Sequence, residues 1–481
     1  MNRCFQSAIL TFIGVCLLAL SAGAQQANWW YFGDHVGLDF SSGIPVEVAD
    51  GQTSEYAVFH TEGSACISDA AGNLLFYSNG NVVWNKNHEI MPNGGNLAGD
   101  HSSTHAALIL PVPGSNHRYY LFVTDSFLEE PQTGPTVYVV DMCMDNGLGD
   151  IDLVFGGQQI HDEFTEKMAV TRHANGTDYW LVTHITLSNE FRAFQVTAEG
   201  LSTPVSSFVG AVHADEDSVG VGVAIGQMKF SPDGQRLALT AANGLEFAEV
   251  FDFDSATGQL TNPIHLTMEL GGYGIAFSLD ASKLYVRGFG GLFQFNLEAG
   301  TPADINFSKT EIVTGGTNQL SGLQLGPDGK IYAIAYFTSS ISVIHSPNEF
   351  YPDCDFELHA IVLENPGLSF SFPSFLDSFN YPAMERDCSG NTVEEENVFG
   401  MSVFPNPSSG RLSIERGSLP AMLVSVVVHD MLGKEVFIAN LALDQSKTLE
   451  LGFLPDGTYQ LMLVIDQKMV FSEQIVLLHG N

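Results

Sequence analysis

Residues 228–240 read MKFSPDGQRLALT and carry the clearest folding signal in the chain. Two short, largely apolar runs flank the tetrapeptide Ser231-Pro232-Asp233-Gly234. Proline fixes φ at a value that suits a tight turn, and glycine tolerates the positive φ that a reversal often needs. The intervening aspartate can also accept a hydrogen bond from the turn backbone. The stretch therefore predicts a β-hairpin with two short strands.

The same strand-turn-strand pattern recurs along the chain. It appears at 66–78 (CISDAAGNLLFYS), 108–124, 168–183, 275–287 and 323–335 (LQLGPDGKIYAIA). The turn positions Gly72, Asn116, Gly176, Gly234, Ala281 and Gly329 are 44, 60, 58, 47 and 48 residues apart. Most of these hairpins are followed by further strand-like runs. A repeat of about 40 to 50 residues made only of strands is typical of β-propeller blades.

These repeats predict an all-β chain in which residues 25–385 form a WD40/kelch-like β-propeller of about seven four-stranded blades. Six blades carry the repeat. We expect the seventh to combine Trp29–Phe40 with residues 368–379, since joining the first and last strands would close the ring and remove exposed edges. Six or eight blades remain open as alternatives.

The last part of the chain predicts a separate small domain. Residues 411–414 and 459–463 alternate apolar and polar side chains, as half-buried strands do. Turn-forming residues lie between such runs at 406–410, 432–434 and 455–457. Short strands at this spacing predict an Ig-like β-sandwich over residues 399–481. Residues 386–398 are polar and acidic, and are expected to be a linker.

This tail resembles the type A C-terminal sorting domain of proteins exported by the Bacteroidetes type IX secretion system. The matching residues are Pro405, Asn406, Pro407, Gly410, Asp430, Gly433, Lys434, Gly457 and Tyr459. The resemblance implies that the secretion translocon and sorting machinery bind the tail. It also implies a secreted or cell-surface protein. The opening NWWYFGDHVGLDFSSG (28–43) resembles secreted Bacteroidetes propeller-like proteins without an assigned activity.

The amino terminus agrees with export. Arg3 precedes an apolar run from Ala8 to Leu20, and the small residues 22–24 suit a cleavage site. We expect residues 1–24 to be a signal peptide that is cleaved before Gln25. The run is short for a membrane span, and no later segment is long and apolar enough, so the mature chain is expected to contain no transmembrane segment.

The charge balance excludes one class of partner. The chain has 55 acidic and 18 basic residues, for a formal net charge of -37. Nucleic-acid binding needs a basic surface and is therefore not expected. The composition predicts no cofactor, although bound Ca²⁺ could screen part of the acidic surface.

Three groups are candidate binding residues. Trp84 and Trp180 could stack on a sugar or a peptide at the channel mouth. His101 and His105 share a face of an extended segment, and the acidic run Asp215, Glu216 and Asp217 could hold a cation. His161, His173, His184 and His213 allow a composite site, but no spacing requires one. No catalytic residue is predicted, because no nucleophile, zinc-protease or phosphate-loop motif occurs.

Four cysteines follow the expected signal peptide, and none belongs to a CxxC pair. An even number in an exported protein is consistent with disulfides. Cys354 with Cys388 is the preferred pair, and Cys66 with Cys143 is a weaker one.

The sequence favours a non-enzymatic propeller that binds a glycan, peptide or protein outside the cell. An exported hydrolase or lyase with an active site at the channel mouth is the alternative. A matrix or adhesion component is a third hypothesis.

Overall fold

A computed structural model describes most of the chain, in two compact units, Met1–Asp387 and Cys388–Asn481. The described residues are 22–33, 35–53, 62–127, 133–213, 221–241, 247–268, 271–288, 290–314, 320–335, 339–364, 369–382, 384, 386–388, 402–415, 422–430, 435–443, 446–465 and 468–479. Among them, no helix is long and apolar enough to cross a membrane.

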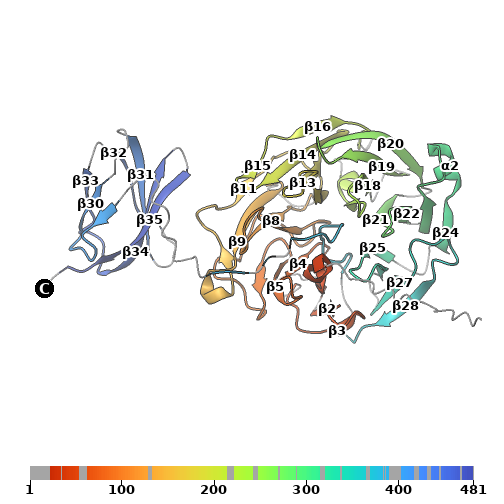
Figure 1. The fold of residues 1–481 in the computed structure, drawn as a ribbon, viewed down its shortest axis with the longest axis horizontal. Coiled ribbons are helices and arrows are strands. Elements are labelled where there is room, and N and C mark those ends of the chain that lie inside the picture. The colour runs from red at the N-terminus through yellow and green to blue at the C-terminus, as the bar shows by residue number, and fades with distance from the viewer. Residues whose placement is uncertain are drawn as a thin grey trace, which may run out of the picture. The chain divides into compact units, whose positions relative to one another are not determined.

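Within the residues described above, the first unit contains seven antiparallel sheets that follow one another around a common centre (Figure 1). The first three are β1 (Trp29–Phe32), β2 (Val36–Asp39) and β3 (Val46–Val48); β4 (Ala65–Ser68), β5 (Leu74–Ser78) and β6 (Val83–Asn85); and β7 (Ala107–Pro111), β8 (Arg118–Val123), β9 (Thr136–Asp141), β10 (Asp150–Ile151) and β11 (Gln158–Gln159).

The fourth to seventh sheets complete the ring. They are β12 (Met168–Arg172), β13 (Tyr179–His184), β14 (Glu190–Thr197), β15 (Gly200–Leu201) and β16 (Val205–Phe208); β17 (Met228–Phe230), β18 (Arg236–Thr240), β19 (Phe247–Asp254) and β20 (Gln259–Thr267); β21 (Gly272–Phe277), β22 (Lys283–Gly288), β23 (Gly291–Asn296) and β24 (Thr310–Thr314); and β25 (Leu320–Leu325), β26 (Ile331–Ala335), β27 (Ser340–Ile344) and β28 (Phe356–Val362). The short helices are η1 (Ala22–Ala27), η2 (Asp145–Gly147), α1 (Val221–Ala224) and α2 (Pro302–Phe307).

The predicted β-propeller is confirmed. All six predicted hairpins form, and each supplies the first two strands of a sheet. In the hairpin at residues 228–240, Gly234 adopts φ 70° and its amide donates to the Ser231 carbonyl oxygen. Three of the seven sheets have four strands in the described residues, and the others have three or five.

The predicted composite blade is wrong. In the described part of the chain, the first sheet contains β1, β2 and β3, and Ser369–Tyr381 forms no strand of it. This segment instead touches the first strands of several sheets. Ser374 donates its amide to the Ser64 carbonyl oxygen, next to β4 (2.7 Å), and the Phe370 carbonyl oxygen accepts from Gly322 of β25 (2.7 Å).

Further contacts extend around the ring. Ser371 accepts from the amide side chain of Gln227, just before β17 (2.8 Å), and Asp377 accepts from the amide of Phe230 (2.9 Å). Arg172 of β12 donates to the Asn380 carbonyl oxygen (2.9 Å). Because first strands of neighbouring sheets contact one another, the segment must lie at the centre of the ring. The cavity left beside it measures about 10 Å³, room for one water at most. At this place, Phe375 and Asp377 of the segment leave little free space beside β12 and β17.

The second unit has its own core and two antiparallel sheets, so the predicted sandwich is confirmed. One sheet contains β29 (Ser402–Phe404), β30 (Arg411–Glu415) and β33 (Ser446–Glu450), and the other β32 (Glu435–Leu443), β31 (Met422–Asp430), β34 (Gly457–Ile465) and β35 (Lys468–Leu477). Buried apolar side chains from both sheets pack together, among them Leu412, Val426 and Leu461.

The cysteines do not follow the predicted pairing. Cys143 and Cys388 each take part in a disulfide, whereas Cys66 and Cys354 are free and buried. The preferred pair of Cys354 with Cys388 is therefore wrong. Cys354 is fully buried in the hydrophobic core that contains Trp30, and its thiol interacts with the hydroxyl of Tyr285. Cys66 accepts a hydrogen bond from the amide of Tyr31, which holds it as a core residue.

Candidate functional site

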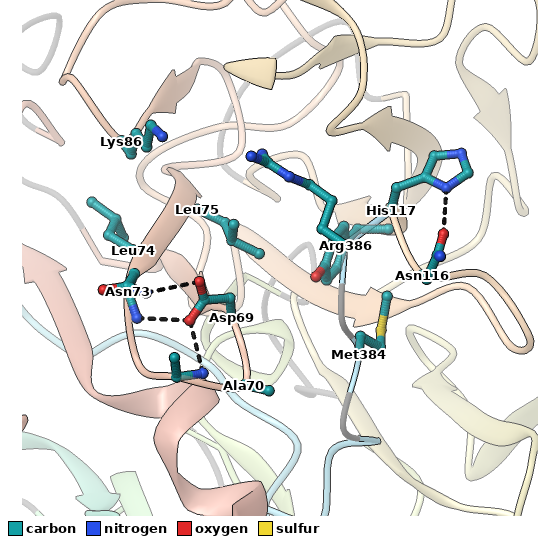
Figure 2. A pocket seen from close by; sticks show the side chains of 12 residues that line it. Asp69, Ala70, Asn73, Leu74, Leu75, Lys86, Asn116, His117, Met384 and Arg386 are labelled. Carbon is teal, nitrogen blue, oxygen red and sulfur yellow. Dashed lines mark hydrogen bonds between the residues drawn. The ribbon is translucent and has the colours of Figure 1, made fainter. Parts of the chain in front are cut away.

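A pocket of about 710 Å³ lies where the first strands of the second and third sheets end (Figure 2). Its lining comes from the turn between β4 and β5, the start of β5, the residue after β6, the turn between β7 and β8, the start of β8, and two residues that follow the central segment. The lining residues are Asp69, Ala70, Ala71, Asn73, Leu74, Leu75, Lys86, Asn116, His117, Tyr119, Met384 and Arg386. We call it the basic pocket, after Lys86, His117 and Arg386.

In the basic pocket the carboxylate has hydrogen-bond partners, whereas the two cations have no carboxylate partner among the described residues. The single carboxylate among its lining residues, Asp69, accepts hydrogen bonds from Ala71 and Asn73 within its own turn. Arg386 donates one guanidinium hydrogen to the Gly147 carbonyl oxygen (2.8 Å) and is exposed. Lys86 is exposed as well, and neither cation forms an ion pair with a carboxylate within the described part of the chain. The pocket therefore offers two cations to an incoming anion.

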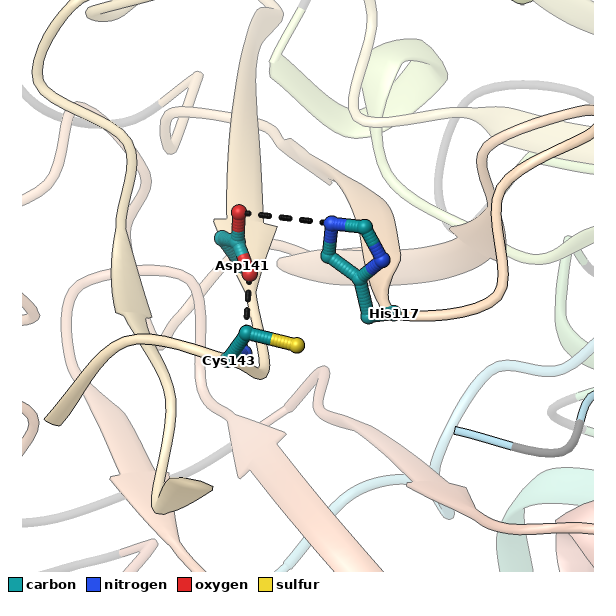
Figure 3. A group of neighbouring side chains, drawn as sticks. All are labelled: His117, Asp141 and Cys143. Carbon is teal, nitrogen blue, oxygen red and sulfur yellow. Dashed lines mark hydrogen bonds and ion pairs between the residues drawn. The ribbon is translucent and has the colours of Figure 1, made fainter. Parts of the chain in front are cut away.

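His117 belongs to a second group beside this pocket (Figure 3). One donor atom each from His117, Asp141 and Cys143 lies within 4.8 Å of the others, and His117 Nε2 is 3.6 Å from Asp141 Oδ2. Cys143 is disulfide-bonded, however, so it offers no thiolate, which is the form that binds a metal. In this oxidised state the group lacks its third ligand.

A polar cluster that is buried except for the partly exposed Glu62 lies at the other end of the first strands, where they begin. It consists of Glu62 before β4, Thr104 before β7, Glu166 and Lys167 before β12, and Tyr273 on β21, and we call it the entrance cluster. Glu166 accepts two hydrogen bonds from Thr104 (2.9 Å each) and one from the amide of Phe127 (3.0 Å). Tyr273 donates its hydroxyl hydrogen to Glu62 (2.9 Å).

Burial shifts the ionisation of the entrance cluster. It raises the pKa of Glu62 to about 8, and the neighbouring Glu166 charge adds to the shift. Burial also raises the pKa of Glu166 and lowers that of Lys167 to about 7. The Lys167 ammonium donates to the carbonyl oxygens of Val223, Ala224 and Ile225 at 2.9 to 3.0 Å. Burial therefore favours the protonated form of both carboxyl groups.

We expect Glu62→Gln to stabilise the protein at alkaline pH. Because the folded-state pKa of Glu62 is raised from about 4.5 to about 8, its contribution to stability is fully present below pH 4.5 and is lost as pH rises through 8. As the pH rises from about 4.5 to about 8, the urea unfolding midpoint of the variant should therefore increase relative to that of the wild type. Glu89→Gln, at an exposed site, is the control. A pH-independent difference would contradict this reading.

Trp84 and Trp180 were predicted to stack on a ligand, and this prediction is wrong. Trp84 is fully buried and stacks on Tyr77 at 5.4 Å between ring centroids. Trp180 is 3% exposed, and its indole N–H donates to the Ser255 carbonyl oxygen (2.8 Å). Both side chains fill space within the propeller, so neither presents a face to a ligand.

The histidine and acidic candidates are not brought together either. His101 is partly exposed, whereas His105 is buried and donates to the Glu166 carbonyl oxygen (3.1 Å). These two histidines form no metal-ligand group within the described residues. Asp215, Glu216 and Asp217 lie outside the described residues. Lys86 and Arg386 were not singled out from the sequence. Basic residues are rare in this chain, and that rarity was the one signal that could have drawn attention to them.

The sorting residues lie along one part of the sandwich. Asn406 donates to the Gln474 carbonyl oxygen (2.7 Å) and accepts from the amide of Val476 (2.9 Å), which anchors the Pro405–Pro407 turn to β35. Gly410 has φ 97°, and an added Cβ would lie 2.5 Å from Gly452 Cα. Tyr459 of β34 lies opposite Asp430 of β31 in the sheet, and Gly457 is the first residue of β34. Gly433 and Lys434 lie outside the described residues.

Comparison with known proteins identifies the tail. Residues 402–477 match the secretion system C-terminal sorting domain. The chain is thus a β-propeller with a type IX sorting domain, and it is exported to the cell surface or secreted. This domain also indicates a Bacteroidetes source and interaction with the type IX secretion machinery. A comparison of the chain with curated proteins finds no match.

Several solved structures are similar to the chain at low identity. The periplasmic gluconolactonase of Pseudomonas aeruginosa is 11% identical, with a TM-score of 0.39, over 77% of this chain and 94% of that one. The hydrazine synthase of Kuenenia stuttgartiensis is 13% identical, with a TM-score of 0.41, over 67% of this chain and 93% of that one. A putative 6-phosphogluconolactonase from Bacteroides uniformis is 12% identical, with a TM-score of 0.35, over 78% of this chain and 94% of that one. At these values the likeness carries no conclusion about activity.

Proposed function

We propose that this protein is a cell-surface or secreted binding module that takes an acidic glycan into the basic pocket. The observation that carries the proposal is the pair of cations, Lys86 and Arg386, on the lining of one open pocket. Residues 25–387 contain only twelve lysines and arginines. Two of them line this pocket without a carboxylate partner among the described residues. On a chain of net charge -37, such a local excess of positive charge favours a carboxylate or sulfate group.

The rest of the lining suits a sugar. Asn73 and Asn116 contribute amide groups and Tyr119 an aromatic side chain, alongside the apolar side chains of Leu74 and Leu75. Carbohydrates offer both hydroxyl groups and apolar ring faces to such a surface. Because the whole chain repels anions at long range, a short acidic oligosaccharide is favoured over a long polyanion.

The double variant Lys86→Gln and Arg386→Gln should weaken binding of a uronate-containing oligosaccharide by at least about tenfold. Each substitution removes a charge-assisted hydrogen bond, and about 1.4 kcal/mol corresponds to one factor of ten. Titration calorimetry of the purified protein measures the change. Lys309→Gln is the matched control, since Lys309 lies over the ring of Phe293, in the sixth sheet. Unchanged affinity in the double variant would overturn the proposal. So would binding of a neutral oligosaccharide with the same affinity as the uronate-containing one.

A second candidate function is hydrolysis or elimination at the entrance cluster. The pair of Glu62 and Glu166, with the Tyr273 hydroxyl on Glu62, supports it, because paired carboxyl groups of raised pKa suit acid–base chemistry. Glu62 precedes β4 and Asp69 follows it, so the cluster and the basic pocket lie at opposite ends of that strand. Turnover of an oligosaccharide that is abolished by Glu166→Gln, yet unaffected by Lys86→Gln, would favour this function over binding.

A further inference from the structure

We propose that His184 and His213 form a site for a transition-metal ion, with Glu249 as the carboxylate that orients His213. His184 ends β13 in the fourth sheet, His213 follows β16, and Glu249 lies on β19 in the fifth sheet. These sheets are neighbours in the ring (Figure 1). The two imidazole rings are fully buried, and their centroids are 4.3 Å apart. The site goes beyond the proposed glycan binding and uses other residues.

The ring nitrogens of this pair lack partners. Neither ring nitrogen of His184 has a hydrogen-bond partner among the described residues, nor does Nδ1 of His213. A buried polar group without a partner costs about 1 to 3 kcal/mol. The rings of Phe191 and Phe247, which contact the two histidines, supply no hydrogen-bonding atom of their own. A bound ion would take the lone pair of one nitrogen on each ring and so satisfy two of these three atoms.

Glu249 gives His213 the orientation of a metal ligand. His213 Nε2 lies 3.4 Å from Glu249 Oε2, and this carboxylate is 2% exposed. The other oxygen of Glu249 accepts from the amide of Ala211 (3.0 Å) and lies 3.8 Å from His265 Nδ1. A hydrogen bond from Nε2 to the carboxylate leaves the lone pair on Nδ1 free to bind a metal. Metal-binding histidines commonly donate their other N–H group to a carboxylate in this way.

The local charges suit a neutral imidazole pair. Burial lowers the pKa of both His184 and His213, which keeps them in the unprotonated form that binds metals. Lys167 is a nearby cation, but burial lowers its pKa to about 7 and three carbonyl oxygens hold its ammonium group. Imidazole ligands favour Zn²⁺, Cu²⁺ or Ni²⁺ over Ca²⁺. With two histidine ligands, positions remain for water or a ligand group.

The test uses the full exported protein, stripped of metal with a chelator and titrated with Co²⁺ and Zn²⁺. We expect one equivalent of Co²⁺ to produce visible ligand-field absorption and Zn²⁺ to raise the melting temperature. His184→Gln and His213→Gln should each abolish the absorption. Glu249→Gln should weaken metal affinity by about 10- to 100-fold, as expected for a positioning residue. His345→Gln, which alters a partly exposed histidine paired with Glu357, should change nothing.

Three results would overturn the proposal. One is the absence of both absorption and stabilisation in the wild type. The second is undiminished binding in both histidine variants, and the third is binding lost instead in His117→Gln, which would move the ion to the group of Figure 3. If a variant fails to fold, anomalous scattering from zinc-soaked wild-type crystals decides. A peak about 2.1 Å from one ring nitrogen of each histidine supports the site, and the absence of such a peak refutes it.

Discussion

Deleting residues 399–481 is expected to reduce surface display and secretion to background while the propeller still folds. The sorting domain is a compact unit with two sheets and its own core, so its loss removes no strand from the propeller. The secretion machinery would then lack the segment that it recognises. We expect the truncated protein to accumulate in the periplasm. Cell fractionation, together with protease treatment of intact cells, measures the distribution.

The control is a single substitution within the same domain. Lys447→Gln alters an exposed side chain of β33 and should leave export unchanged. The truncated protein should also retain the cooperative unfolding of the propeller. Normal surface display of the truncated protein would contradict the assignment of the tail.

Trp30→Ala is expected to produce the largest loss of stability among single substitutions in the propeller. Trp30 is fully buried, and its ring contacts Phe40, Tyr332, Phe372 and Phe375 at centroid distances of 4.8 to 5.7 Å. These partners belong to the first sheet region, the seventh sheet and the central segment, so one side chain joins the two ends of the ring. Replacing a buried tryptophan by alanine costs about 3 to 5 kcal/mol in unfolding free energy.

The neighbouring Trp29 provides the comparison. It is half-buried, and its indole N–H donates to the Gly72 carbonyl oxygen (2.9 Å). Trp29→Ala should therefore cost clearly less than Trp30→Ala in urea unfolding at pH 7. Equal losses in the two variants would show that ring closure does not depend on the contacts of Trp30.

The sequence predicted the parts of this fold that depend on local chemistry. The turn at Ser231–Gly234 and its five counterparts specify hairpins within about 15 residues, so the blades could be recognised one by one. The central segment could not be placed in this way. Its contacts join residues far apart in the chain, such as Ser374 with Ser64, and no local pattern encodes them.

The site residues show the same division. Trp84 and Trp180 were plausible as exposed platforms because an aromatic in a strand does not reveal which face is covered. Lys86 and Arg386 are 300 residues apart, and only the folded ring brings them to one pocket. His184, His213 and Glu249 likewise come from separate segments of two sheets, so their spacing along the chain gave no metal motif.

The most direct measurement is a crystal structure of the protein soaked with a uronate-containing oligosaccharide. We expect electron density in the basic pocket, with a carboxylate within hydrogen-bonding distance of Lys86 Nζ and the Arg386 guanidinium. Density at the entrance cluster with the basic pocket empty, or no bound sugar at concentrations that saturate binding in solution, would contradict it.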